Sequence, residues 1–170
     1  MTDQGIATIP RPSVPGAELE ELRRFHRDGT WSGTIEPGGM GPGTPAQRAA
    51  GRARHHWIQE GRWVVGDYEQ DQFLDDGTFV LKWELHWVCG WDPFAGEYRA
   101  TIADNYGRAD VLRGRIDGDR MVFESMRSAA PFIRLTWVTG PDESITWRNE
   151  MSADGESWIL VEEYVIVASD

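Results

Sequence analysis

The stretch KWELHWVCGW, residues 82–91, alternates large apolar side chains with a different set of residues. One face of this pattern carries Trp83, Leu85, Trp87, Cys89 and Trp91. The other face carries Glu84, His86 and Val88. Successive side chains of a β-strand point to opposite faces, so this period of two predicts a strand with one buried face. We expect the aromatic face inside and His86 on the outer wall; if the strand is turned the other way, His86 becomes an interior acid–base group.

Similar strands follow one another along most of the chain. The pattern predicts strands at about 30–36, 54–60, 62–74, 78–91, 97–104, 109–116, 120–126, 131–139, 144–151 and 157–167. Turn signals separate them, and Asp-Gly pairs such as 117–118 favour hairpins between consecutive strands. Such a meander forms either a sandwich or a closed up-and-down barrel, and closure removes the exposed strand edges. We therefore expect an all-β fold, a closed antiparallel barrel of nine or ten strands with room for one small ligand.

The first part of the chain departs from the strand pattern. Residues 1–16 contain three prolines and predict a flexible tail, which leaves 17–170 as a single barrel domain. Apolar residues at helical spacing predict one short helix over 17–27, which caps an end of the barrel. The Gly- and Pro-rich segment 37–45 predicts a long loop, for which a binding lid and simple disorder are both open.

Several segments resemble a known family. Gly29-Thr30-Trp31 enters the first strand in the manner of lipocalin-type barrels. The segments that follow are Gly61–Glu69, Gly90–Pro93, Tyr98, Asp104, Gly114, Asp117-Gly118, Asp154-Gly155 and Trp158. In this order they resemble the bacterial family catalogued as domain of unknown function 1579, whose members are similar to lipocalin-like (calycin-type) barrels. The resemblance spans most of residues 22–167 and implies the fold, but it implies no general activity.

Histidine positions argue against one cofactor of a related barrel family. The nitrobindins bind haem through a histidine late in the chain. All four histidines here, His26, His55, His56 and His86, lie in the first 86 residues. His55 and His56 are neighbours on one strand and point to opposite faces, so they cannot chelate one ion together. We predict no metal site and no cofactor.

Composition excludes several classes of partner. Seventeen Lys and Arg stand against 28 Asp and Glu, and the net charge of −11 would repel nucleic acid and anionic membranes. No segment has the length and apolar character of a membrane helix or a secretory signal, so we expect a cytoplasmic protein. A single cysteine, Cys89, allows no internal disulfide.

Four polar residues interrupt apolar strand patterns and are the candidate catalytic groups: Arg134, Asp104, Tyr98 and Tyr68. Arg134 needs a partner if it is buried, for which Asp104, Glu150 and Glu162 are candidates. Its guanidinium would orient an oxyanion or carbonyl, and a tyrosine would transfer the proton. The alternative for Arg134 is a salt bridge that only closes the barrel.

Further residues are expected to bind the ligand. They are Trp57, Trp83, Trp87, His86, Trp147 and Glu162. We expect a protein with a Trp-lined pocket that acts, without a cofactor, as a cyclase, isomerase or dehydratase on an apolar aromatic or polycyclic metabolite. The alternatives are a non-catalytic carrier or sensor of a hydrophobic small molecule, and a structural barrel with a solid interior. A homodimer is compatible with all three.

Overall fold

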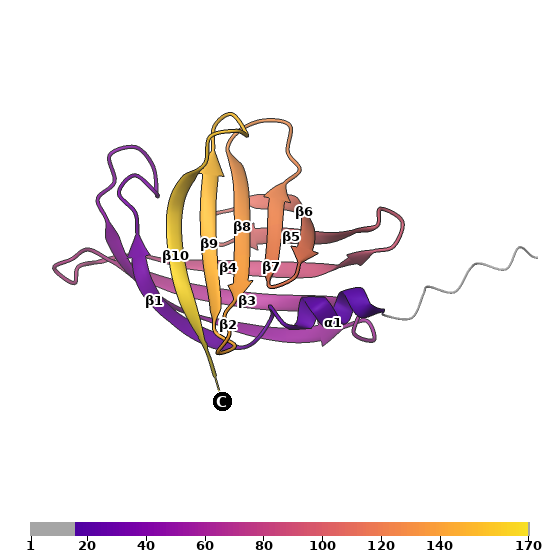
Figure 1. Ribbon diagram of the computed structural model, residues 1–170. Helices are drawn as coiled ribbons and strands as arrows, with labels where there is room; N and C mark the ends of the chain where they lie inside the picture. Colours follow the sequence, from indigo (N-terminus) through magenta and orange to yellow (C-terminus); the bar gives the residue numbers. More distant parts are fainter. Residues whose placement is uncertain (1–15, 170) are drawn as a thin grey trace, which may run out of the picture.

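A closed barrel of ten antiparallel strands makes up most of the structure, a computed structural model that describes residues 16–169 (Figure 1). Its elements are α1 (Ala17–Arg23), β1 (Gly29–Ile35), β2 (Gln47–Ile58), β3 (Trp63–Phe73), β4 (Phe79–Asp92), β5 (Glu97–Asp104), β6 (Ala109–Asp117), β7 (Arg120–Ser125), β8 (Phe132–Thr139), β9 (Ile145–Ser152) and β10 (Ile159–Ala168). Each strand pairs with its neighbour in the chain, and β1 closes the barrel against β10. The predicted all-β barrel with one short N-terminal helix is confirmed. The tail predicted over 1–16 lies outside the described residues, except for Gly16.

Strand parity places the aromatic face of β4 inside the barrel, as predicted. The β4–β5 register aligns Trp87 with Ile102 and Cys89 with Ala100, so the same face of both strands points inward. Trp87 and Ala100 are each only 1% exposed, whereas the neighbouring His86 side chain is 54% exposed on the outer wall. The predicted interior set of Trp83, Leu85, Trp87, Tyr98, Ala100 and Ile102 is therefore confirmed.

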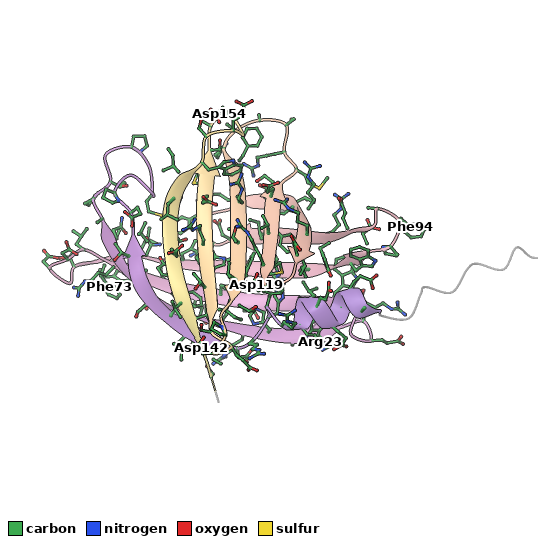
Figure 2. The ribbon with its side chains drawn as sticks, in the orientation of Figure 1. Arg23, Phe73, Phe94, Asp119, Asp142 and Asp154 are labelled. Atoms are coloured by element: carbon green, nitrogen blue, oxygen red, sulfur yellow. The ribbon has the colours of Figure 1, made fainter. Side chains whose placement is uncertain are left out.

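The helix covers one end of the barrel. Leu19, Leu22 and Phe25 are buried there, since they recur at helical spacing on one side of the segment. The Tyr98 hydroxyl donates a hydrogen bond to the carbonyl oxygen of Glu18 at 2.9 Å, which ties α1 to β5. Asp119 and Asp142 lie at this helix-covered end, and Asp154 lies at the opposite end (Figure 2). We call the opposite end the open end.

Two elements differ from the sequence prediction. Strand β2 begins at Gln47, well before the expected residue 54, because β1 and β3 pair with the whole segment despite its Ala and Gly residues. Helix α1 ends at Arg23 rather than near residue 27, and a turn follows it. The connection after β1 folds back at the open end: the Glu36 amide donates to the Val161 carbonyl at 2.8 Å, and Met40 packs against the core.

Aromatic rings fill the helix-covered half of the interior. Eight of them, which we call the aromatic cluster, are Trp31, Tyr164, Trp147, Trp137, Trp87, His26, His55 and Tyr68. Each contacts the next in this order, and Tyr68 contacts Trp31 again, with ring centroids 5.3–6.5 Å apart. These separations lie in the range of favourable aromatic pairs. The cluster therefore forms a continuous packed layer across the barrel.

The close packing of Trp31 on β2 gives a stability prediction. A Cβ atom at Gly51 would collide with the Trp31 indole and lie 2.6 Å from the Glu69 carbonyl oxygen. We expect Gly51→Ala to lower the free energy of unfolding by about 1–3 kcal/mol, as overpacking does. Ala50→Ser, at the exposed neighbouring position, should change it by less than about 0.5 kcal/mol. Urea unfolding measures both, and equal stability of the two variants would contradict the packing argument.

Candidate functional site

An inner cavity of about 230 Å³ lies at the open end of the barrel. Strands β4, β5, β6, β8 and β9 contribute its walls. The apolar lining residues are Trp83, Leu85, Ile102, Ala109, Pro131, Ile133, Leu135, Trp147 and Met151. The polar ones are Asp104, Arg108, Asp110, Arg127 and Asn149. A concave, largely apolar hollow with a few polar groups is the usual form of a small-molecule site.

Asp104 and Arg108 form an ion pair at the cavity. The Arg108 Nε atom donates to Asp104 Oδ2 at 2.6 Å, and the Trp83 indole nitrogen donates to the same oxygen at 3.3 Å. Burial raises the pKa of Asp104, but the hydrogen bonds from Arg108 and Trp83 outweigh it and hold the pKa below its ordinary value. Asp104 is therefore ionised near neutral pH and fixes the Trp83 indole.

Asp110 and Arg127 form a second ion pair at the cavity. Arg127 Nε lies 3.0 Å from Asp110 Oδ2, which also accepts a hydrogen bond from the Ser125 hydroxyl at 2.7 Å. The same guanidinium donates to the carbonyl oxygens of Pro131 and Ala109. Arg127 thus ties the connection between β7 and β8 to the start of β6.

A buried carboxylate stands behind one cavity wall. Glu162 on β10 is 5% exposed. It accepts hydrogen bonds from Asn149 Nδ2 at 3.1 Å, Gln70 Nε2 at 3.2 Å and the Tyr164 hydroxyl at 2.5 Å. Gln70 in turn accepts a hydrogen bond from the Trp31 indole at 2.9 Å. The network therefore links the cavity-lining Asn149 to the aromatic cluster.

An apolar groove adjoins the inner cavity. It has a volume of about 630 Å³ and lies between the 37–42 segment, the 130–131 segment and the start of β10. Pro131 and Met151 line both hollows. A molecule larger than the inner cavity could therefore extend into the groove.

Three of the predicted site residues line the inner cavity: Asp104, Trp83 and Trp147. Glu162 lies one residue behind it, in contact with Asn149. These four come together because β4, β5, β9 and β10 present the same inward face at the open end.

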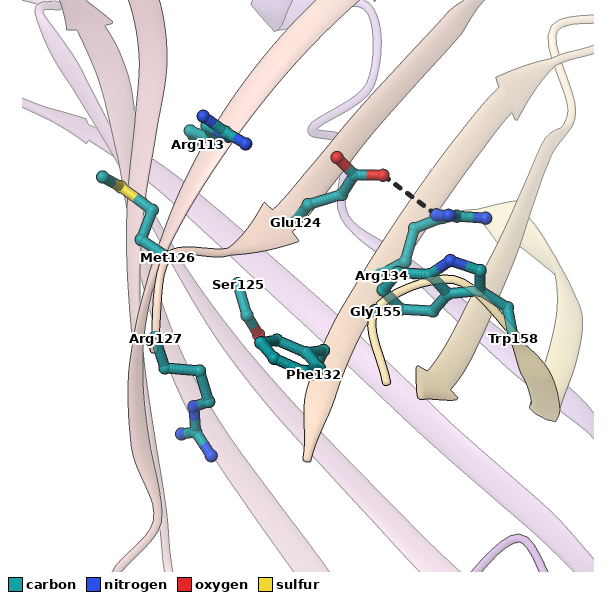
Figure 3. A pocket seen from close by; sticks show the side chains of 9 residues that line it. All are labelled: Arg113, Glu124, Ser125, Met126, Arg127, Phe132, Arg134, Gly155 and Trp158. Atoms are coloured by element: carbon teal, nitrogen blue, oxygen red, sulfur yellow. Dashed lines mark hydrogen bonds and ion pairs between the residues drawn. The ribbon is translucent and has the colours of Figure 1, made fainter. Parts of the chain in front are cut away.

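The placement of Arg134 at the cavity is corrected, because this side chain lies on the outer face of β8 (Figure 3). Its Nε donates to Glu124 Oε1 at 3.0 Å, its NH1 lies 3.8 Å from Glu150, and the guanidinium stacks on Trp158 at 3.8 Å. Of its three expected partners only Glu150 is correct. Arg134 interrupts the apolar run because Ile133 and Leu135 face inward while it faces outward.

The other predicted residues lie away from the inner cavity. Tyr98 is under α1, where burial raises its pKa and its hydroxyl bonds Glu18. Tyr68 bonds His55 Nε2 at 2.9 Å inside the aromatic cluster, and burial raises its pKa also. Trp87 is part of that cluster, Trp57 lies beneath the Arg23 guanidinium, and His86 pairs with Asp67 on the outer wall. The expectation that Tyr68 and Tyr98 reach the cavity is therefore wrong.

Sequence analysis missed the polar lining residues other than Asp104. Asn149 shares its parity with Trp147 and Met151 on β9, and Asp110 shares its parity with the buried Leu112 on β6. The same two-residue alternation that identified β4 would have placed both inside.

His26 is a buried histidine in an unusual place, between α1 and the barrel interior. The Trp87 indole nitrogen donates to His26 Nε2 at 3.0 Å, so the hydrogen lies on Nδ1 and is donated to the Leu22 carbonyl at 3.0 Å. Burial, with a contribution from nearby His55, lowers the pKa of His26 to about 3. His26 is therefore neutral at physiological pH and holds α1 to the aromatic cluster.

Two kinds of feature are absent from the described part of the chain. Within 16–169, no three His, Cys, Asp or Glu side chains converge as metal ligands would. In that same part of the chain, no helix has the length and apolar character needed to cross a membrane.

Comparison with known proteins supports the fold. No family model matches the chain, and no curated protein matches it. A solved structure described as "Crystal Structure of Rv2717c from M. tuberculosis" is similar, with a TM-score of 0.57 and 13% sequence identity over 91% of this chain and 99% of the other. At this identity the likeness shows a shared barrel fold alone. The resemblance to domain of unknown function 1579 stays a prediction.

The buried His26 predicts a specific pH dependence of stability. Its pKa is about 3 in the folded protein and 6.5 for the free side chain, so the unfolded state takes up the proton first. Stability should therefore be full above pH 6.5 and fall as the pH drops toward 3, by roughly 1.4 kcal/mol per pH unit from this group. His26→Gln keeps an acceptor for Trp87 and should show a correspondingly smaller slope. Urea unfolding between pH 6.5 and 4 measures both slopes, and parallel curves would rule out this role.

Proposed function

We propose that this protein binds a small, apolar, ring-containing molecule in the inner cavity. The observation that carries the proposal is the cavity of about 230 Å³, walled by Trp83, Trp147 and aliphatic side chains at the open end. Flat rings bury most of their surface against indoles, and the loss of that surface from water drives binding. A structural barrel with a solid interior is less well supported, because such a barrel would have no cavity of this size.

The volume of the cavity limits the ligand. Pockets for drug-sized molecules usually measure about 300–1,000 Å³, and this one is smaller. It suits a molecule of one or two rings. A longer ligand would place its remaining apolar part in the groove beyond Pro131 and Met151.

Carriage or sensing is better supported than catalysis. Asp104 and Asp110 at the cavity are each paired with an arginine, and the lowered pKa of Asp104 makes it a weak base. The tyrosines expected to transfer protons hold other contacts away from the cavity. We therefore favour a carrier or sensor of a hydrophobic small molecule, without cofactor or nucleic acid and located in the cytoplasm.

A cofactor-independent enzyme of the cyclase, isomerase or dehydratase kind is the second candidate. The observation in its favour is the Asp104 side chain, which is 4% exposed and lies at an apolar cavity beside the Arg108 guanidinium. A carboxylate and a guanidinium together could polarise a bound carbonyl group. Native mass spectrometry of freshly purified protein would distinguish the candidates, since a carrier retains one unchanged molecule.

The tryptophans themselves report whether the cavity binds a ligand. In ¹H–¹⁵N correlation spectra, toluene and naphthalene should shift the indole signals of Trp83 and Trp147, which line the cavity. The signals of Trp57 and Trp158 should stay in place, because these side chains stack under Arg23 and Arg134 outside it. Shifts spread evenly over all nine tryptophans would indicate non-specific adsorption and contradict the proposal.

Filling the cavity should abolish this binding. Ile133→Phe adds volume to the cavity wall, and we expect it to weaken naphthalene binding at least tenfold, about 1.4 kcal/mol. Val165→Phe is the matched control, because Val165 is 52% exposed on the outer face of β10. Titration calorimetry measures both, after thermal unfolding has shown that each variant is folded. Unchanged affinity in a folded Ile133→Phe variant would mean that the probe binds elsewhere.

A further inference from the structure

We propose that the ring-containing molecule held in the inner cavity carries a carboxylate, which binds the two terminal nitrogens of the Arg108 guanidinium. The inference rests on the proposed binding function and narrows the class of ligand to aromatic acids. The hydrogen bonds at the polar side chains that line the cavity lead to it, because they leave one accessible group without partners.

Asp104 has no capacity left for a ligand. Its Oδ1 accepts hydrogen bonds from the backbone amides of Tyr106 and Arg108, at 3.0 and 2.9 Å. Its Oδ2 accepts hydrogen bonds from Arg108 Nε at 2.6 Å and from the Trp83 indole nitrogen at 3.3 Å. An ionised carboxylate offers about four lone-pair sites, so all of them are in use. A ligand that donates to Asp104 would have to displace one of these partners.

Three further polar side chains at the cavity are also engaged. Asp110 accepts hydrogen bonds from a backbone amide and a hydroxyl and pairs with Arg127 Nε. The other two nitrogens of Arg127 donate to backbone carbonyl oxygens. Asn149 donates through Nδ2 to Glu162, and its Oδ1 is too deeply buried to contact a ligand. None of these three side chains therefore presents an accessible polar atom that lacks a partner.

Arg108 differs from the other polar lining residues. Its Nε holds Asp104, but its two terminal nitrogens make no hydrogen bond or ion pair with the residues that the structure describes. The Arg108 side chain is 63% exposed, whereas that of Asp104 is 4% exposed. The guanidinium therefore lies at the solvent-facing edge of the cavity, where a bound molecule can reach it.

A guanidinium held by Nε, with both terminal nitrogens free, favours a carboxylate as its ligand. The terminal nitrogens form a planar fork that matches the two oxygens of a carboxylate. The pair with Asp104 already orders the side chain, which lowers the entropic cost of binding. Arg127 neutralises the neighbouring Asp110, so the ligand would not face an unpaired negative charge there. The ring can then contact the apolar walls while its charged group stays at the edge, without the cost of burying a charge.

Benzoate, benzamide and toluene test this inference, because they share one ring and differ only in a carboxylate, a carboxamide or a methyl group. We expect benzoate to bind about three- to tenfold more tightly than benzamide, the effect of a charge pair partly exposed to water. Added salt should weaken the binding of benzoate and leave that of toluene unchanged. Titrations followed by ¹H–¹⁵N spectra measure the affinities, and the Arg108 Nε signal should shift with benzoate. These comparisons use the unaltered protein.

Variants assign the preference to Arg108. Arg108→Met keeps an apolar stem and should bind benzoate no more tightly than benzamide. Arg108→Lys keeps the charge but lacks the fork, and it should lose most of the preference. Arg115→Met is the matched control, because it removes the same charge from a side chain that is 65% exposed, pairs with Glu124 and lies outside the cavity lining. It should keep the preference for benzoate.

The outcomes separate this inference from the proposed function. Equal or tighter binding of benzamide in the unaltered protein, or a benzoate preference that persists in Arg108→Met, would overturn the inference. Tighter binding of phenyl phosphate than of benzoate would overturn the assignment of a carboxylate. In each case toluene bound at Trp83 and Trp147 would leave the proposed function standing. Failure of toluene and of benzoate to bind the cavity would overturn both.

Discussion

Contact between aromatic rings inside the helix-covered half of the barrel is the interaction on which the rest of the structure depends. Eight rings, one from the turn after α1 and one from each of seven strands, contact one another in sequence around the interior. Their bulk requires small neighbours, so Gly33 lies under the Tyr164 ring and Gly51 under Trp31. The layer also fixes the helix, because His26 joins Trp87 to the Leu22 carbonyl. The same aromatic contacts therefore pack the interior of the closed barrel and hold α1 in place.

The same layer divides the interior into two halves with different properties. On the helix side the aromatic rings pack against one another, whereas a cavity of about 230 Å³ remains beside Trp147 at the open end. Charged groups occur at that cavity only as Asp–Arg pairs, so an apolar molecule entering it meets neutralised charge rather than an isolated ion. The packed aromatic cluster on one side of the cavity and the Asp–Arg ion pairs at its wall together favour retention of a ligand over proton transfer to it.

Two-residue alternation predicted the fold well and the site only in part. It placed Trp83 and Leu85 inside correctly, because apolar and polar residues separate cleanly on β4. The expectation for Arg134 rested on its interruption of an apolar run, whereas its parity, opposite to that of Ile133 and Leu135, places the guanidinium outside, where it stacks on Trp158. Asn149 was overlooked although it shares its parity with Trp147 and Met151, and the partner that makes its amide tolerable inside, Glu162, lies on the next strand. Parity is a local property, whereas the partners that make a polar group tolerable inside come from distant strands.

The seam between β1 and β10 has a consequence for the way this chain acquires its structure. Gly29 pairs with Ala168 and Ile35 with Glu162, so the first and last strands meet across nearly the whole described sequence. Hairpins such as β2–β3 and β3–β4 need only local chain and can form as soon as their residues leave the ribosome. The seam cannot form until β10 has been synthesised, and such distant pairings are slow because a long loop must close first. A nascent chain therefore exposes the free edges of β1 and of its newest strand until β10 has been made, and these edges can mispair during that time.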